Sequence, residues 1–222
     1  MKYAIAALMM SLGVCLAQTT TTDYTFTLNQ VIPDANATGI SLGTNLTGMA
    51  GSISKVTVGL DITGGFNGDL YAYLTGPNGG FAVLLNRTGV TTGNSSGYFD
   101  QGFNVTLDDS ASYNSIHSYQ SFSYTLIGGQ LTSIWATDGE NVDPLGSSVG
   151  VAGPTATLLS LNGTNPNGNW TFFAADLSGG GSAILNNITL SITTVPEPQS
   201  WALGLLGIPA LLVVLRRKDG SR

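Results

Sequence analysis

The segment that most constrains the fold is residues 64–85, GGFNGDLYAYLTGPNGGFAVLL. Leu70, Ala72 and Leu74 alternate with two tyrosines, which is the period of a half-buried β-strand. The sequence Gly-Pro-Asn-Gly-Gly that follows predicts a chain reversal, because proline fixes φ while Asn and Gly tolerate positive φ. The apolar run FAVLL then returns as a second strand, which we expect to be covered on both faces.

The composition extends this β prediction to the rest of the domain. The chain has 30 glycines and only 9% charged residues, and strong helix formers are scarce where the patterns are clearest. Asn-Gly steps, which are turn signals, begin at Asn67, Asn78, Asn162 and Asn167. Further strands are expected at residues 24–28, 53–62, 103–107, 121–127, 168–176 and 183–192, and loops at 32–51 and 89–97. The pattern favours one all-β sandwich domain.

The N-terminus, residues 1–17, has the pattern of a secretory signal peptide. Lys2 supplies the positive charge, and the apolar run that follows is too short to span a bilayer comfortably. Small residues at Cys15 and Ala17 predict cleavage between Ala17 and Gln18. Cleavage there removes the only cysteine, so we expect the mature domain, residues 18–194, to contain no disulfide.

The C-terminal tail, residues 195–222, contains three features in order: the tripeptide Pro196-Glu197-Pro198, the apolar run 201–215, and the basic pair Arg216-Arg217. Fifteen helical residues reach about 22 Å, short of a hydrocarbon core of about 30 Å, although flanking residues and local thinning can cover the gap. With Lys218, this pair forms a basic cluster that predicts a cytoplasmic C-terminus for the transmembrane segment. The alternative is a plain tail anchor.

This tail resembles a PEP-CTERM sorting signal, the class that exosortase-type enzymes process in bacteria. The resemblance implies an exported protein that is transiently anchored in the membrane through residues 201–215 and then released to the cell surface, envelope or extracellular matrix. It also implies an exosortase-type sorting enzyme as a partner.

The domain resembles the P domain (P/Homo B domain) that follows the catalytic domain of subtilisin-like proprotein convertases. The motifs are Gly68-Asp69-Leu70, the turn Thr75-Gly76-Pro77-Asn78-Gly79, and the strand Gly-Asn-Trp-Thr-Phe-Phe-Ala-Ala-Asp at 168–176. Two features depart from the family pattern, since a histidine before Asp69 and a tryptophan near Asn187 are absent. The resemblance covers about residues 25–192 and implies a jelly-roll-like β-sandwich without the convertase catalytic domain.

The domain is acidic, because residues 18–194 hold eleven acids and two bases, a net charge of −9. Nucleic-acid binding is disfavoured, since it needs clustered Lys and Arg. Zinc is also disfavoured, with one histidine and no cysteine in the mature domain. Calcium is the one cofactor that these acids suggest, with Asp69, Asp108 and Asp109 as the first candidate ligands and the acids at 138–143 as further ones. The alternative is that these acids only cap turns or lie in solvent.

Catalysis is not expected. His117 is the only histidine, so any Ser-His-Asp arrangement would need it, and no Gly-x-Ser-x-Gly motif lies nearby. We expect His117 to be an exposed loop residue and predict no catalytic residues. A serine endopeptidase activity would belong to the catalytic domain that this chain lacks.

The sequence therefore predicts an exported, non-catalytic surface protein with a structural or adhesive role, in contact with exopolysaccharide or surface proteins. Tyr71 and Tyr73 could stack on sugars, although cross-strand packing is the commoner use of such pairs. The alternative is an accessory module that supports a separately encoded subtilisin-like protease. For the fold, we expect Trp170 to be buried near Leu70 or Leu74.

Overall fold

The computed structural model describes residues 18–196. Two predicted segments lie outside the described residues. One is the signal peptide, which ends at Ala17, and the other is the tail from Glu197 onward, which contains Pro198, residues 201–215, Arg216 and Arg217. Within the described residues, Thr19–Pro196 forms one compact unit. No helix in the described part of the chain is long and apolar enough to cross a membrane.

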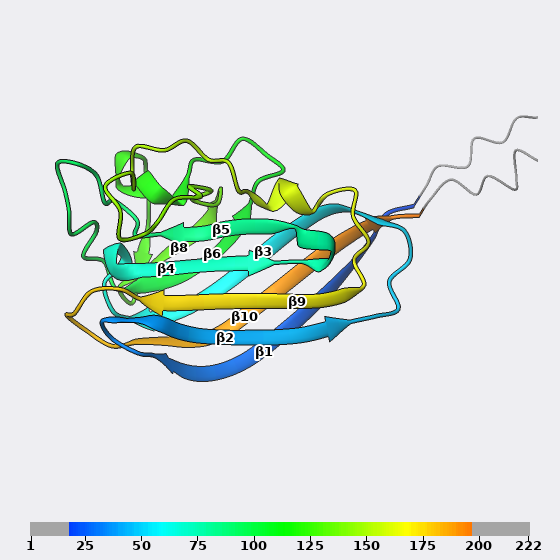
Figure 1. The fold of residues 1–222 in the computed structure, drawn as a ribbon, viewed down its shortest axis with the longest axis horizontal. Coiled ribbons are helices and arrows are strands. Elements are labelled where there is room, and N and C mark those ends of the chain that lie inside the picture. Colours follow the sequence, from blue (N-terminus) through cyan, green and yellow to red (C-terminus); the bar gives the residue numbers. More distant parts are fainter. Residues whose placement is uncertain (1–17, 197–222) are drawn as a thin grey trace, which may run out of the picture. The chain divides into compact units, whose positions relative to one another are not determined.

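Two β-sheets lie face to face, with the four-stranded sheet in front in Figure 1. The six-stranded sheet has the order β1 (Thr20–Ile32), β10 (Ala183–Val195), β3 (Ser52–Gly64), β6 (Gly102–Asp108), β8 (Gln130–Trp135) and β7 (Leu126–Ile127). The other sheet has the order β2 (Asn36–Leu46), β9 (Gly168–Asp176), β4 (Leu70–Thr75) and β5 (Phe81–Asn86). Four short 3₁₀ helices connect strands: η1 (Asn67–Asp69), η2 (Pro77–Gly79), η3 (Ile116–Ser121) and η4 (Leu158–Leu161).

The connectivity is that of a jelly roll. Without β7 and β8, the two sheets have the strand orders 1-10-3-6 and 2-9-4-5, and all neighbours within them are antiparallel. Eight strands in two such sheets form the double Greek key. The predicted jelly-roll-like β-sandwich is therefore confirmed, with β8 added in parallel beside β6.

The predicted hairpin is β4 and β5. Asn78 and Gly79 have φ values of 61° and 82°, the positive values that the turn sequence predicts. All residues of β5 after Phe81 are buried, as expected for a strand covered on both faces. The neighbouring strand β9 buries Trp170, which is 1% exposed and donates its indole N–H to the carbonyl of Pro166 at 2.9 Å. Trp170 and Leu74 line the same apolar space between the sheets, so the prediction for Trp170 is confirmed.

Two predictions about strands were wrong. Residues 32–51, predicted as a loop, contain the eleven-residue strand β2. Its sequence, NATGISLGTNL, is rich in Asn, Thr and Gly, and its extended form depends on pairing with β9 at the sheet edge. The predicted strand at 121–127 is reduced to the two residues of β7. Its first residue, Ser121, belongs to η3, and the strand that pairs with β6 is β8 instead.

The first and last strands bring both ends of the domain together. β1 and β10 pair antiparallel from Thr20 opposite Thr194 to Ile32 opposite Ala183. The described chain therefore begins and ends at one pole of the sandwich, which we call the terminal pole (Figure 1). The opposite end, the loop pole, contains the turn at 33–35, η1 and the β9–β10 loop at 177–182.

Candidate functional site

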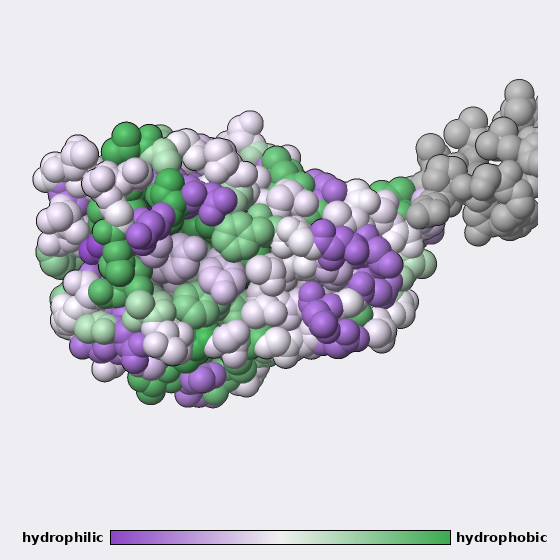
Figure 2. All heavy atoms as spheres, in the orientation of Figure 1, coloured by the Kyte–Doolittle hydropathy of each residue, from purple (hydrophilic) through white to green (hydrophobic). Residues whose placement is uncertain are grey.

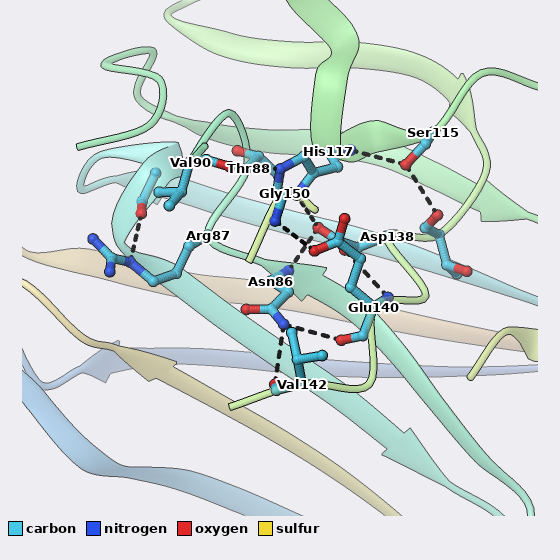
Figure 3. A network of polar contacts seen from close by, with 12 residues as sticks. Asn86, Arg87, Thr88, Val90, Ser115, His117, Asp138, Glu140, Val142 and Gly150 are labelled. Carbon is cyan, nitrogen blue, oxygen red and sulfur yellow. Dashed lines mark hydrogen bonds and ion pairs between the residues drawn. The ribbon is translucent and has the colours of Figure 1, made fainter. Parts of the chain in front are cut away.

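A buried polar network surrounds His117, which lies in η3 (Figure 3). Its Nδ1 is 2.8 Å from Oδ2 of Asp138, and its Nε2 is 3.0 Å from the carbonyl oxygen of Val90. The residue is 8% exposed, so the prediction of an exposed loop histidine was wrong. The Ser115 hydroxyl caps η3 by accepting the backbone N–H of His117, and this short helix directs the ring inward.

The two contacts fix the protonation state of His117. A carbonyl oxygen only accepts hydrogen bonds, and an ionised carboxylate does the same, so both ring nitrogens must donate. Burial disfavours this charged form, but the hydrogen bond and charge of Asp138, with the Val90 carbonyl, outweigh burial and raise the pKa of His117 to about 9. His117 is therefore an imidazolium cation at neutral pH.

The acids of this network come from the loop after β8. Oδ2 of Asp138 accepts the backbone N–H of Asn86 at 3.0 Å, and Oε2 of Glu140 accepts that of Gly150 at 2.7 Å. Asn86 closes the network, since its side-chain amide donates to the carbonyl of Glu140 at 3.0 Å. Burial raises the pKa of Glu140, and the charge of Asp138 acts in the same direction. The network fastens η3 and the 138–150 loop to the end of β5.

The three side chains His117, Asp138 and Glu140 have ligand atoms within 4.8 Å of one another, a spacing compatible with a metal ion. A metal, however, needs a free lone pair on the imidazole, whereas the carboxylate of Asp138 and the carbonyl of Val90 are acceptors that require both nitrogens of His117 to donate. A general base needs the same lone pair. The imidazolium itself neutralises the carboxylate, so the network is best described as a structural ion pair.

Asp108 and Asp109 stand where β6 ends and are bound to protein groups. Asp108 accepts from Nζ of Lys55 at 2.8 Å and from Ser110. Burial opposes the ionised form of Asp108, but the Lys55 and Ser110 bonds outweigh it and lower its pKa. The carboxylate of Asp109 accepts the backbone N–H and the hydroxyl of Thr137 and the backbone N–H of Leu158, at 2.7–2.8 Å.

Asp69 lies at the loop pole, away from Asp108. Along the β3–β6 ladder, Asp108 is opposite Thr57, whereas Asp69 is the last residue of η1, which follows the other end of β3 at Gly64. The structure therefore does not bring Asp69 together with the Asp108–Asp109 pair. It brings Asp69 close to Asp176, the last residue of β9, since Asp176 is paired with Leu70 and the N–H of Leu177 donates to the carbonyl of Asp69 at 2.9 Å.

Sequence reasoning did not identify Asp176 as a site residue, although its position in β9 contains the signal. Trp170, Phe172 and Ala174 are the buried alternate residues of this strand, and Asp176 continues their series. It is 0% exposed, and its Oδ2 has no hydrogen-bond partner. Burial raises the pKa of Asp176 to about 6, and the charges of Asp69 and Asp34 add to the rise.

An aromatic stripe lies on the outer face of the four-stranded sheet: Tyr71, Tyr73, Phe81 and Phe173. The rings of Tyr73 and Phe173 stack on each other, with centroids 4.9 Å apart and an interplanar angle of 16°. These two faces cover each other, which is the cross-strand packing expected of such pairs. Figure 2 shows hydrophilic residues gathered toward the terminal pole on this side of the molecule, with apolar and hydrophilic residues intermixed over the rest.

No protein-family model matches the sequence, and no curated protein matches it either. Among solved structures, the serine protease of Aeromonas sobria has a TM-score of 0.41 at 13% identity, with 81% of this chain and 28% of that chain covered. The complex of that protease with the chaperone ORF2 gives 0.43 at 12% identity, over 82% and 28%. This chain thus spans less than a third of the length of those chains, and similarity at this level supports no inference about activity.

Proposed function

We propose that this chain is an exported surface protein, sorted by its C-terminal tail, whose folded part is a non-catalytic structural or binding module. The observation that carries the proposal is the pairing of β1 with β10, which places Thr20 beside Thr194. The last strand therefore leaves the domain at the terminal pole, at the end of the sandwich opposite the loop pole. The segment before the tail is also firmly held, because β10 is hydrogen-bonded on both sides, to β1 and to β3.

The state of His117 supports the non-catalytic part of this proposal. Both imidazole nitrogens are engaged by Asp138 and Val90, so this histidine does not offer the free base that Ser-His-Asp catalysis requires. The role we assign to the domain is therefore mechanical or adhesive, with exopolysaccharide or other surface proteins as the class of partner.

The experiment compares the full-length gene in bacteria with and without an exosortase-type enzyme, followed by mass spectrometry of the purified protein. We expect the mature protein to begin at Gln18 in both strains. It should lack Arg216 and Arg217 only in the strain that contains the exosortase-type enzyme. Replacement of Pro196, Glu197 and Pro198 by alanine should leave the tail attached, while Pro144→Ala, in the loop after β8, should be processed normally. Recovery of the intact chain, residues 1–222, from the cell surface would contradict the proposal.

The second candidate is an accessory module for a separately encoded subtilisin-like protease. The observation that favours it is that the P-domain-like motifs fall on or next to β4 and β9, the two inner strands of the four-stranded sheet. Co-purification of a serine protease with the tagged full-length chain, and loss of that protease activity when the chain is deleted, would favour this function over the first.

A further inference from the structure

At the loop pole, three acids come from segments that are distant in the sequence. Asp34 lies in the β1–β2 turn, Asp69 in η1 and Asp176 at the end of β9. The three segments are in contact: a Cβ added at Gly179 would lie 4.0 Å from Cβ of Ala35, and one added at Gly180 would lie 2.8 Å from the ring of Phe66. The β9–β10 loop thus covers both the turn and η1.

Asp176 distinguishes this group from an ordinary acidic patch. It follows the inward series of β9, so its carboxyl group is directed into the end of the sandwich, where it is 0% exposed. Oδ1 receives only a long contact of 3.4 Å from the N–H of Ser178, and Oδ2 has no partner. A buried carboxylate without a partner is costly, so the remaining oxygen needs a proton or a cation.

Within residues 18–196, no cation forms an ion pair with Asp176. Arg87, the nearest base to Asp69, donates its Nε–H to the carbonyl of Gly68 at 3.1 Å and a terminal N–H to the carbonyl of Ser95 at 3.3 Å. Among the described residues, the ion pairs are those of Lys55 with Asp108 and His117 with Asp138. Asp69 is itself 6% exposed, and the pairing of Asp176 with the adjacent Leu70 places these two buried acids at the same end of the sheet.

We propose that Asp69 and Asp176 bind a calcium ion at the loop pole, with Asp34 contributing charge from its outer side. Calcium takes oxygen ligands from carboxylates, backbone carbonyls and water in flexible geometry, which suits strand ends and a glycine-rich loop. Zinc would need nitrogen or sulfur ligands. Asp34 is exposed on its turn and takes the outer role for that reason. This inference is independent of export and of sorting.

The competing explanation is that Asp176 simply stays protonated beside Asp69. Burial and the neighbouring acids raise the pKa of Asp176, which fits either outcome, so binding must be measured. The experiment records thermal melts of the purified full-length chain at pH 7.5 in calcium chloride, in chelator, and in magnesium chloride at matched ionic strength. Calcium at a hundredfold its dissociation constant should raise the midpoint by about 5–10 °C, and titration calorimetry should give one ion per chain.

Variants locate the site. Asp176→Asn and Asp69→Asn should each abolish the calcium-dependent shift of the melting midpoint. In chelator, the melting midpoint of Asp176→Asn should equal or exceed that of the unmodified protein, because the substitution removes an unpaired buried charge. Asp108→Asn, at the other end of the sheet, is the matched control and should keep the shift. The proposal is overturned if calcium and chelator give the same curve, if magnesium acts as strongly as calcium, or if the shift survives in both loop-pole variants.

Discussion

The buried ion pair of His117 and Asp138 makes stability depend on pH in a definite direction. The pKa of His117 is about 9 in the folded protein, against 6.5 when the ring is in water. Because the folded pKa is the higher of the two, the ion pair contributes fully below pH 6.5, and its contribution is lost as the pH rises through about 9. A difference of about 2.5 pKa units corresponds to roughly 3 kcal/mol, nearly all of which should disappear between pH 6.5 and 9.5.

The assay is a series of urea melts of the purified protein across that range, at constant ionic strength and in chelator. The shifted tyrosines and Asp176 interfere little with this window. Burial raises the pKa values of Tyr71, Tyr98 and Tyr119 above 10, and Asp176, with a pKa of about 6, is largely ionised by pH 6.5. The free energy of unfolding should therefore fall by about 3 kcal/mol between pH 6.5 and 9.5, with the slope expected for one titrating group.

Two variants serve as controls for this titration. His117→Asn retains a donor near the position of Nδ1, facing Asp138, and His117→Gln retains one near Nε2, facing Val90. Neither titrates, so both profiles should be flat between pH 6.5 and 9.5, at a lower stability than the unmodified protein at pH 6.5. A flat profile for the unmodified protein, or the same slope in all three proteins, would show that His117 is not a buried cation.

Two further substitutions test the packing and the polar framework. Trp170→Ala should lower the free energy of unfolding by about 3–5 kcal/mol, because it empties a fully buried aromatic site between the sheets; a change below about 1 kcal/mol in urea melts would place this side chain outside the core. Asp109→Asn should lower the free energy of unfolding by about 1–3 kcal/mol, because the new amide must turn its N–H₂ group toward a donor of Thr137 or Leu158. A melt of Asp109→Asn that overlays that of the unmodified protein would mean that these hydrogen bonds contribute no net stability.

The elements that could be predicted from the sequence are those whose local pattern agrees with their surroundings. In β4, apolar and more polar residues alternate because one face of the strand packs on the core. β9 was predicted correctly because its large apolar residues point inward. β2 could not be predicted in this way, since only Ile40 and Leu46 are buried along it. Its extended conformation comes from the partner β9, which local composition does not describe.

The candidate sites were harder to predict, because acids of the same type differ only in their neighbours. Asp109 looked like a ligand beside Asp108, yet backbone and hydroxyl donors from Thr137 and Leu158 already surround it. The sequence around His117 contains no sign of burial, since its partners Val90 and Asp138 come from other segments. Each of these differences is a property of the tertiary structure.

The small number of cations in the domain explains why one acid remains unmatched. The buried acids are Asp69, Asp108, Asp138, Glu140 and Asp176. Lys55 neutralises Asp108, the imidazolium of His117 neutralises Asp138, and the N–H of Gly150 donates to Glu140. Burial raises the pKa of Asp69, and the charge of Arg87 offsets only part of that rise. Asp176 is left with one long contact from Ser178, so at neutral pH its charge must be balanced from solvent, and a bound cation meets that need without moving the fold.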